Sequence, residues 1–541
     1  MSDESTAPDG KAAAREDRPS GGGEDSELLE RIRGLEEEIG RLRERNESLE
    51  ERNRDLEEEN EIFRDALRTK GIDIENLLAA NKELMFRVSM NSSNSSKPPS
   101  TDGYARPKPR SLRAKTGRKP GGQPGHAGRN MTIPHEPDLF EEHLPARCGG
   151  CPRKDGCRAD GMLRCSDRRY VVDVVTTTVV TEHSLFEARC PMGGAGDTVI
   201  RGRFPDGVSA HVQYGSGTRA IVSVLDTNGA MSDSRISTLM RDLFGITLSP
   251  GTVVSMTSEC ADAVRGTVEK VRREIAGSPV GNFDETGARV NGALGWIHVS
   301  STPTCTRLTI SGKRGREGMD RNGVLPGFTG RAVHDCFTAY DGYTDAAHAL
   351  CCAHLLRETI GMEELEPDHA WASAMRCLLL DMKSARDDAF DRGRSGLDRA
   401  AVRRFESIYD LVLELADTEC PPPPPPEVRR RGRPRKGRER SLIERLRVRK
   451  DQVCRFIHDF AVPFDNNLAE RDLRNIKTKL KVSGCFRSMD RAQDYLDTAS
   501  YLSTARKRGI GAVKALRLAF DGSPDTILGR DGIDPALASC D

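Results

Sequence analysis

The sequence lacks a net charge, a long apolar run and a signal peptide. Its 83 lysines and arginines balance 83 aspartates and glutamates, so total charge identifies no partner and only the distribution of charge can. No run of about 18 apolar residues occurs, which excludes a membrane-spanning helix. The residues after Met1 lack the charged and apolar regions of a signal peptide, so we expect a cytoplasmic protein.

Apolar residues are also scarce, at 36% of the chain, which predicts sizeable disordered or coiled stretches beside a folded core. A length of 541 residues favours three or four units. The 15 cysteines, in a reducing compartment, indicate metal ligands or buried thiols rather than disulfides.

The N-terminal part predicts disorder followed by a helix. Residues 1–25 are rich in glycine, serine and acidic residues, and we expect them to be disordered. Residues 26–90 predict a helix that dimerises as a coiled coil, because leucine recurs every seven residues. A single charged helix packed on its own protein is the alternative. The seam positions are Leu28, Leu35, Leu42, Leu49 and Leu56, with Ile32, Ile39, Asn46, Asn53 and Asn60.

Residues 91–135 predict a disordered basic arm. The arm holds nine lysines or arginines, among them Arg118 and Lys119, against the single acid Asp102. Such a segment cannot build a core, but it can neutralise DNA phosphates without recognising a sequence. A linker that only interacts with solvent is the alternative.

Residues 136–205 predict a zinc-binding β region. Two cysteines separated by two residues lie in a glycine-rich knuckle, and a β-rich run over residues 169–180 is expected to form a hairpin that brings in further thiolates. A knuckle without metal is the alternative. The predicted ligands are Cys148, Cys151, Cys157 and Cys190, with Cys165 as a substitute.

Residues 210–275 predict helices. Within them, residues 244–253 supply a glycine turn and a capped helix start, which fits a helix-turn-helix that binds DNA. An ordinary pair of helices is the alternative.

Two aspartates are predicted to end short strands. Residues 278–352 contain five strand patterns, with Asp284 on the first and Asp335 at the end of the fourth. Asp341 competes as the second acid, but it begins a turn, whereas Asp335 ends an apolar strand. We therefore prefer Asp335.

The third acid is Glu470, on a helix that Asp465 or Asn466 can cap. Asn467 and Arg474 share its face of the helix, and a solvated face with an ion pair is the alternative. Carboxylates suit hard divalent cations, and two such ions can clamp both oxygens of a phosphodiester displacement. Two strand aspartates and a helical glutamate are the pattern of RNase H-like polynucleotidyl transferases. The predicted fold is thus multidomain α+β, with an RNase H-like core completed by residues 461–520 and followed by a tail, residues 521–541.

Residues 353–460 predict a helical insertion into this core. His354 and Arg357 lie one helical turn apart and could meet a phosphate, although a buried structural histidine beside a surface arginine fits equally. A proline run at residues 421–426 precedes a basic segment that resembles an AT-hook, and its alternative is a basic loop that binds any nucleic acid. The candidate DNA contacts there are Arg431, Arg433 and Arg435.

Four strings of sequence resemble insertion sequence 66-type transposases, a branch of the DDE transposases, and the resemblance covers most of the chain. They are Asn-Ser-Ser-Asn-Ser-Ser-Lys-Pro-Pro-Ser from residue 91, Gly-Arg-Lys-Pro-Gly-Gly-Gln-Pro-Gly-His from residue 117, the segment 348–358, and the segment 465–488 around Glu470. The family also places a tyrosine five residues after its second aspartate, which Asp335 and Tyr340 match. Its second cysteine pair reads Cys-Pro-x-Cys, whereas Gly193 occupies the last position here.

This resemblance implies cleavage at the ends of a bacterial mobile element and joining of the 3′-OH to target DNA. Asp284 would bridge two Mg²⁺ or Mn²⁺ ions, with Asp335 completing the shell of one ion and Glu470 that of the other. Water and later the 3′-OH would be the nucleophile. The expected partners are element ends, target DNA, further copies of the chain and helper proteins, with no membrane, in the bacterial cytoplasm at the nucleoid. A zinc-containing DNA-binding regulator and a structure-specific nuclease of the same fold are the alternatives.

Overall fold

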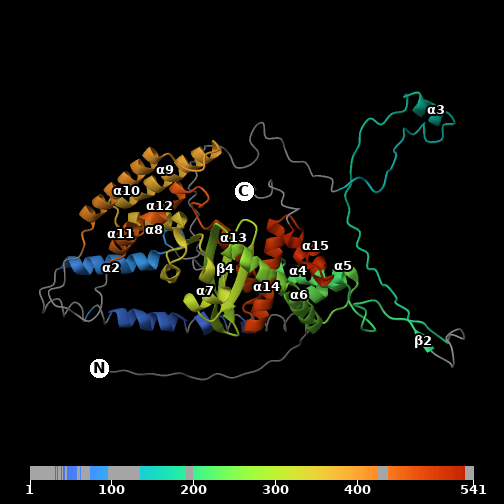
Figure 1. The fold of residues 1–541 in the computed structure, drawn as a ribbon, viewed down its shortest axis with the longest axis horizontal. Helices are drawn as coiled ribbons and strands as arrows, with labels where there is room; N and C mark the ends of the chain where they lie inside the picture. Colours follow the sequence, from blue (N-terminus) through green and yellow to red (C-terminus); the bar gives the residue numbers. More distant parts are fainter. Residues whose placement is uncertain are drawn as a thin grey trace, which may run out of the picture. The chain divides into compact units, whose positions relative to one another are not determined.

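The computed structural model describes residues 31, 33–34, 38, 40–42, 45–57, 61, 74–95, 135–189, 199–422 and 437–529 (Figure 1). The chain divides into two compact units, Met1–Ser89 and Met90–Asp541, and the finer domain limits given above stay predictions. Several predicted features lie outside the described residues: segment 1–25, Arg118 and Lys119, Cys190, and the basic segment with Arg431, Arg433 and Arg435.

The first unit is helical where it is described. Residues 45–57 form continuous helix, and α2 spans Ile74–Ser89. The seam leucines Leu42 and Leu49 are 59% and 52% exposed. An apolar stripe on a charged helix is stabilised when a second helix covers it. The coiled coil itself stays a prediction.

A five-stranded mixed sheet forms the centre of the second unit, as the sequence predicted. Its order is β5-β4-β3-β6-β7. The first three strands form an antiparallel meander, and β6 and β7 run parallel to β3. Asn291 and Gly292 close the first hairpin with φ of 47° and 79°, a backbone conformation for which Asn-Gly is the favoured pair. The strands are β3 (Val280–Val290), β4 (Ala293–Ser301), β5 (Thr306–Ser311), β6 (Arg331–His334) and β7 (Ala347–Leu350).

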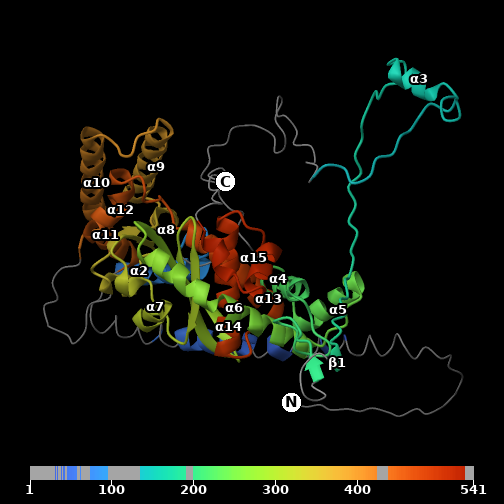
Figure 2. The ribbon, with the colours of Figure 1, turned by 45° about the vertical axis from the view of Figure 1, so that its right-hand side comes forward.

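Helices cover both faces of this sheet (Figure 2). Even-numbered β3 residues such as Ala288 pack on α13 (Asn467–Ser483) and α14 (Met489–Lys507). Odd-numbered Phe283 packs on the opposite side, with the C-terminal end of α6 (Pro250–Ala276) and with α7 (Arg316–Asn322). Successive strand residues point to opposite faces, so this alternation decides which β3 side chains meet α13.

Three helices precede the sheet, in agreement with the predicted pattern. They are α4 (Ser216–Thr227), α5 (Asp233–Phe244) and α6. Gly245 ends α5 in a left-handed conformation with φ of 67°, and Ser249 caps α6 by accepting a hydrogen bond from Thr252 N at 3.0 Å. The glycine turn and the capped start are therefore confirmed, whereas DNA binding through them stays a prediction. After α14, α15 (Ala512–Phe520) packs on α4, and the short helix Pro524–Leu528 belongs to the same core.

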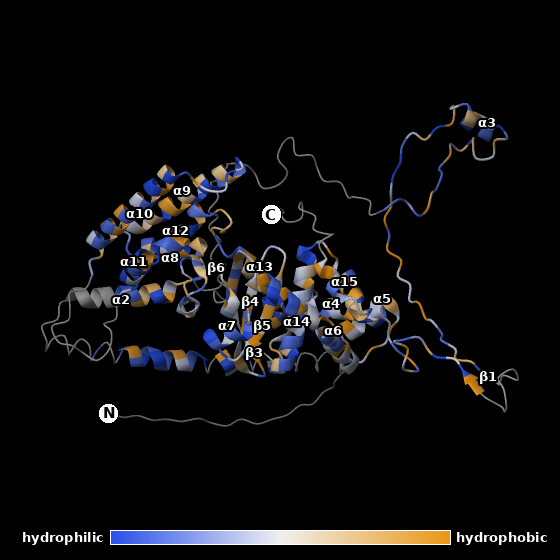
Figure 3. Cartoon of the chain, in the orientation of Figure 1, coloured by the Kyte–Doolittle hydropathy of each residue, from blue (hydrophilic) through white to orange (hydrophobic). Residues whose placement is uncertain are grey.

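The predicted insertion is helical. It contains α8 (Cys352–Leu365), α9 (Trp371–Asp391), α10 (Arg399–Glu419), α11 (Arg438–Val448) and α12 (Lys450–His458). Figure 3 shows polar and apolar residues interspersed along these helices, as expected for helices that bury one side. Across the described part of the chain, no helix combines the length and apolar character needed to cross a bilayer.

The cysteine-rich region differs from the prediction. Residues 169–180 contain no strand, and the hairpin pairs β1 (Glu187–Arg189) with β2 (Val199–Arg201) instead. Val171 and Val180 are 95% and 90% exposed. A valine-rich run forms a stable strand only where a partner strand and an apolar surface cover it, and among the residues that the structure describes this run has neither. The helix α3 (Lys154–Ala159) follows the cysteine knuckle.

Two buried ion pairs fix α13 in place. Asp472 accepts hydrogen bonds from Lys507 Nζ at 2.7 Å and from the hydroxyls of Ser301 and Thr306 at 2.6 and 2.9 Å. Lys479 Nζ lies 2.6 Å from Asp226 of α4. Burial tends to raise the pKa of Asp472, but Lys507 and the two hydroxyls outweigh burial, so its pKa is lowered.

We expect Asp472→Asn to lower the free energy of unfolding by about 3 kcal/mol at neutral pH, because Lys507 would remain buried without its partner charge. The stabilisation requires ionised Asp472, whose pKa is lowered in the folded chain. The difference in free energy of unfolding between the wild type and Asp472→Asn should therefore shrink as the pH falls below about 3.9, the ordinary pKa of aspartate. Urea unfolding at several pH values measures this, with the exposed Asp490→Asn as control. Equal stability of the Asp472→Asn variant and the wild type at neutral pH would contradict the assignment.

Candidate active site

The strand register places Asp284 and Asp335 side by side. β3 and β6 run parallel, and their last paired residues are Asn282 and Val333. Each aspartate lies two residues further along its own strand direction. Neighbouring strands are about 4.8 Å apart, so the two carboxylates occupy adjacent positions at one edge of the pairing.

Glu470 approaches from the helix that covers the same face. It lies in the first turn of α13, the helix that packs on even-numbered β3 residues, and Asp284 is even-numbered. Burial raises the pKa of Asp284 well above its usual value, and the nearby carboxylates of Glu285, Asp335 and Glu470 raise it further. The pKa of Asp335 is also raised, mainly by burial. The predicted acids are thus within electrostatic reach of one another.

A buried asparagine joins the helix of Glu470 to the strand of Asp284. Asn466 is 1% exposed; its amide donates to Phe283 O at 2.8 Å and accepts from the side chain of Asn282 at 2.8 Å. The sequence predicted Asp465 or Asn466 as a helix cap. Asn466 is the N-cap residue but makes no side-chain capping bond, and the carboxylate of Asp465, one residue earlier, accepts a hydrogen bond from Asn467 N at 3.0 Å. Asn466 instead fixes the position at which α13 begins.

Glu285 is a buried acid that we did not predict. It points to the opposite face from Asp284, where its carboxylate accepts from Arg314 Nε at 2.9 Å and from the Tyr340 hydroxyl at 2.8 Å. Burial and the neighbouring Asp335 raise its pKa, while Tyr340 and Arg314 oppose this effect. The only signal in the sequence was its position next to Asp284, and a solvent-exposed strand residue could occupy the same position.

Asp335 and Asp341 have different surroundings. The Asp335 carboxylate accepts a hydrogen bond from Phe337 N at 2.8 Å. The Asp341 side chain is 42% exposed and forms an ion pair with Arg449 at 2.5 Å. Asp341 is therefore exposed and paired with an arginine, whereas Asp335 is buried enough for its pKa to be raised even though Arg314, Arg445 and Arg449 act in the opposite direction.

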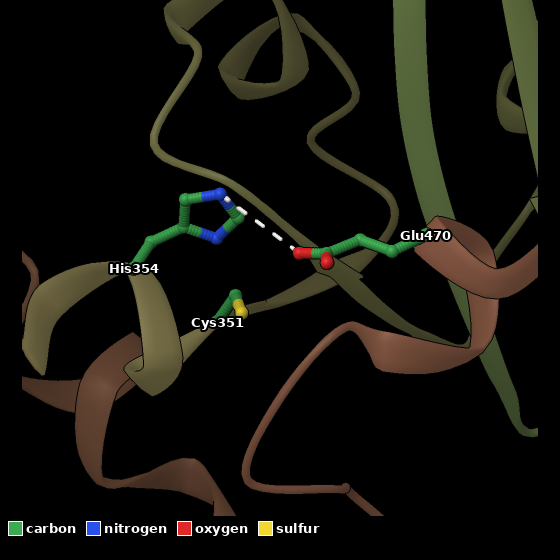
Figure 4. A group of neighbouring side chains, drawn as sticks. All are labelled: Cys351, His354 and Glu470. Atoms are coloured by element: carbon green, nitrogen blue, oxygen red, sulfur yellow. Dashed lines mark ion pairs between the residues drawn. The ribbon is translucent and has the colours of Figure 1, made fainter. Parts of the chain in front are cut away.

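His354 and Arg357 extend the site on the other side of Glu470. His354 Nε2 and Arg357 Nη2 each lie 4.0 Å from Glu470 Oε1. Burial and the adjacent Arg357 lower the pKa of His354 to about 3, so its imidazole is neutral. Glu470 therefore has Arg357 as its nearby cation rather than Arg474, which is exposed, as is Asn467. Cys351, which we did not predict, lies with His354 and Glu470 in a group whose ligand atoms are all within 4.8 Å of one another (Figure 4).

The predicted zinc ligands are only partly described. Cys148 and Cys151 share a turn, in which Cys151 N donates to Cys148 O at 3.3 Å, and Cys157 lies in α3. All three are partly exposed free thiols, and Cys165 is exposed. Within the described ranges, the one cluster of three ligand groups is that of Cys351, His354 and Glu470. The zinc site stays a prediction, because Cys190 falls outside those ranges.

The comparison with known proteins matches this region to one family. A model of the family described as Transposase IS66 family matches residues 211–494, which is more than half of the 541 residues and includes all three predicted acids. A second model, of a family of unknown function, matches residues 23–132. No curated protein matches the chain.

We expect the acid cluster to bind Mn²⁺, because burial raises the pKa values of Asp284 and Asp335 and a bound cation would favour their charged forms. Calorimetric titration should give at least about tenfold weaker binding for Asp284→Asn, Asp335→Asn and Glu470→Gln, and unchanged binding for the matched control Asp341→Asn. Protons compete with the ion, so affinity should fall as pH is lowered, beginning above the ordinary aspartate range because the pKa of Asp284 is raised. Loss of binding in Asp341→Asn alone would show that the wrong second acid was chosen.

Proposed function

The chain belongs to the IS66 transposase family, and from this we propose that it cuts DNA at the ends of a bacterial insertion sequence and joins the freed 3′-OH to target DNA. The observation that carries the proposal is the convergence of three carboxylates from distant parts of the chain. Asp284 lies within β3 rather than at the strand end that the sequence predicted, Asp335 follows β6, and Glu470 lies in the first turn of α13. Both Asp335 and Glu470 raise the pKa of Asp284. Placing carboxylates close together in a partly buried site costs electrostatic free energy, and such unfavourable groupings are more common at functional sites than in purely structural ones.

We propose further that the catalytic core is RNase H-like. Three features support this: the mixed sheet with order β5-β4-β3-β6-β7, the aspartates on its first strand and after its fourth, and a glutamate on a helix that packs on the sheet. The helical insertion separates the second and third acids in sequence, yet both act electrostatically on Asp284.

The acids fit a pair of Mg²⁺ or Mn²⁺ ions. Asp284 would contact both ions, Asp335 one and Glu470 the other. When bound, the ions would stabilise charge on the attacking and leaving oxygens of an in-line displacement. The side chains around them orient the reactants: Asn466 sets the position of Glu470, and Arg357 offers a positive charge to the scissile phosphate. Neutral His354 can share a hydrogen bond with that phosphate or with the leaving oxygen. Asn467 and Arg474 are exposed on the same helix, where DNA can reach them.

DNA binding is proposed for three separate regions. The arm around Arg118 and Lys119 and the segment with Arg431, Arg433 and Arg435 carry dense positive charge, which attracts any phosphate backbone. The third region is the α5–α6 pair, whose capped α6 start is exposed at Ser249 and Pro250. Pro250 has no N–H and Ser249 accepts from the N–H groups of Thr252 and Val253, so a phosphate at this helix start would meet mainly the N–H of Gly251 and the exposed side chains.

A structural zinc ion is proposed for the knuckle of Cys148, Cys151, Cys157 and Cys190. Four thiolates would close the coordination shell, so this ion would contribute to folding and not to chemistry.

We expect one fewer equivalent of zinc in purified Cys148→Ser, measured by elemental analysis against the exposed Cys485→Ser as control. Equal zinc content in wild type and Cys148→Ser would contradict the site.

We also propose that the coiled coil makes the chain a dimer or a larger assembly, so that two element ends are held together. Deletion of residues 26–67 should leave a folded core that sediments as a smaller species, because the exposed seam leucines would lose their partner. Analytical ultracentrifugation measures this. If the deleted protein assembles with the same number of chains as the full-length protein, assembly depends on another surface.

For the catalytic acids, Asp284→Asn, Asp335→Asn and Glu470→Gln should each lower DNA cleavage by about 10³-fold or more, because each removes one charge from a site built on electrostatics. DNA binding, measured by fluorescence anisotropy, should remain. Asp341→Asn is the matched control and should keep most activity.

The products of the same assay separate the candidate functions. A transposase yields strands joined to target DNA, a nuclease yields only hydrolysed ends, and a DNA-binding regulator yields neither. Cleavage that persists in all three acid variants would overturn the assignment of the active site.

A further inference from the structure

A second type of ligand set lies beside the carboxylates. β7 ends at Leu350, Cys351 precedes the first residue of α8, and His354 follows one turn later, so both side chains project from one helix start. Glu470 faces them from the start of α13 (Figure 4). The two helix starts are joined directly, since Asn466 N donates to Cys351 Sγ at 3.2 Å.

The chemistry of these three groups differs from that of the acid cluster. A thiolate, an imidazole and a carboxylate are the ligands of borderline ions such as Zn²⁺ and Co²⁺, whereas Mg²⁺ prefers oxygen alone. Three protein ligands leave a fourth tetrahedral position for water or another ligand.

The observed geometry is close to what such an ion needs. Metal–ligand bonds of about 2.0–2.3 Å in a tetrahedron place ligand atoms about 3.3–3.8 Å apart. His354 Nε2 and Glu470 Oε1 are 4.0 Å apart, and the three ligand atoms lie within 4.8 Å of one another. Adjustments of about 1 Å or less, within the reach of side-chain rotation, would complete the set.

Two further observations favour a ligand at this point. Either ring nitrogen of His354 can be the ligand atom, and Nδ1 is buried without a hydrogen-bond partner in the described part of the chain, which is unusual for a polar atom. The side chains of His354 and Glu470 are nevertheless 16% and 29% exposed, so an ion can reach them from solvent.

We propose that Cys351, His354 and Glu470 form a binding site for a borderline divalent ion of the Zn²⁺ class, and that the bound ion withdraws Glu470 from Asp284 and Asp335. The second half of this proposal rests on the proposed function, because Glu470 is the residue that the two sites share. One carboxylate cannot keep its catalytic orientation while it also completes a thiolate–imidazole site. Zn²⁺ would therefore inhibit cleavage that Mg²⁺ supports.

Binding is tested with Co²⁺, which gives a thiolate-to-metal charge-transfer band in the near ultraviolet. The full chain is titrated, and the spectrum of Cys351→Ser is subtracted from that of the wild type, so that any knuckle cysteines cancel. We expect the difference spectrum to contain a band that saturates at one equivalent of Co²⁺. The control is Cys377→Ser, which lacks an exposed cysteine on α9. Subtracting the spectrum of Cys351→Ser from that of Cys377→Ser should give the same band.

Two further variants keep the Cys351 thiol and change the other ligands, so the test does not depend on Cys351→Ser folding correctly. His354→Gln and Glu470→Gln should each weaken Co²⁺ binding at this band by at least about tenfold. Identical titrations for the wild type and all three ligand variants would overturn the site.

The regulatory half is tested by Zn²⁺ inhibition of Mg²⁺-supported cleavage. We expect the Zn²⁺ concentration for half-inhibition to rise at least about tenfold in Cys351→Ser, relative to the activity of that variant without Zn²⁺. Equal Zn²⁺ sensitivity in both proteins would overturn this half. If the wild type does not cleave DNA at all, the proposed function fails, while the Co²⁺ titration still reports on the metal site.

Discussion

The burial of Asp284 beside other carboxylates, Asp335 and Glu470 among them, is the constraint on which the arrangement of the site depends. Three carboxylates in a partly buried place are unfavourable unless rigid elements hold them there. The parallel register of β3 and β6 fixes the two aspartates, and the amide of Asn466 fixes the glutamate against β3. A divalent cation bound between these carboxylates would reduce the repulsion between them.

The contacts of α13 explain how the fold withstands this repulsion. Asp472 ties the helix to β4, β5 and α14 two residues after Glu470, and Lys479 ties it to α4 further along. The helix that carries Glu470 is thus bound both to the sheet and to the helices before it. The buried Lys479–Asp226 pair therefore couples the position of α13 to that of α4.

Much of the core could be predicted from the sequence because its signals are local. Short apolar and β-branched runs predicted all five strands, although Asp284 lies within its strand and not at the end. A glycine turn before a capping serine predicted the boundary between α5 and α6. Glu285, Cys351 and the role of Asn466 could not be predicted, because each depends on contacts between segments that are far apart in sequence. The hairpin expected at residues 169–180 was wrong because strand propensity alone supplies neither a partner nor an apolar surface.

The central claim is that the three carboxylates hold the catalytic ions, and the most direct test is to locate Mn²⁺ in crystals of the chain bound to a cut DNA end. Anomalous scattering identifies the ion without reference to activity. The account predicts Mn²⁺ peaks in contact with Asp284 and shared with Asp335 and Glu470. Mn²⁺ bound to DNA at another group of side chains, with these three carboxylates free of metal, would contradict it.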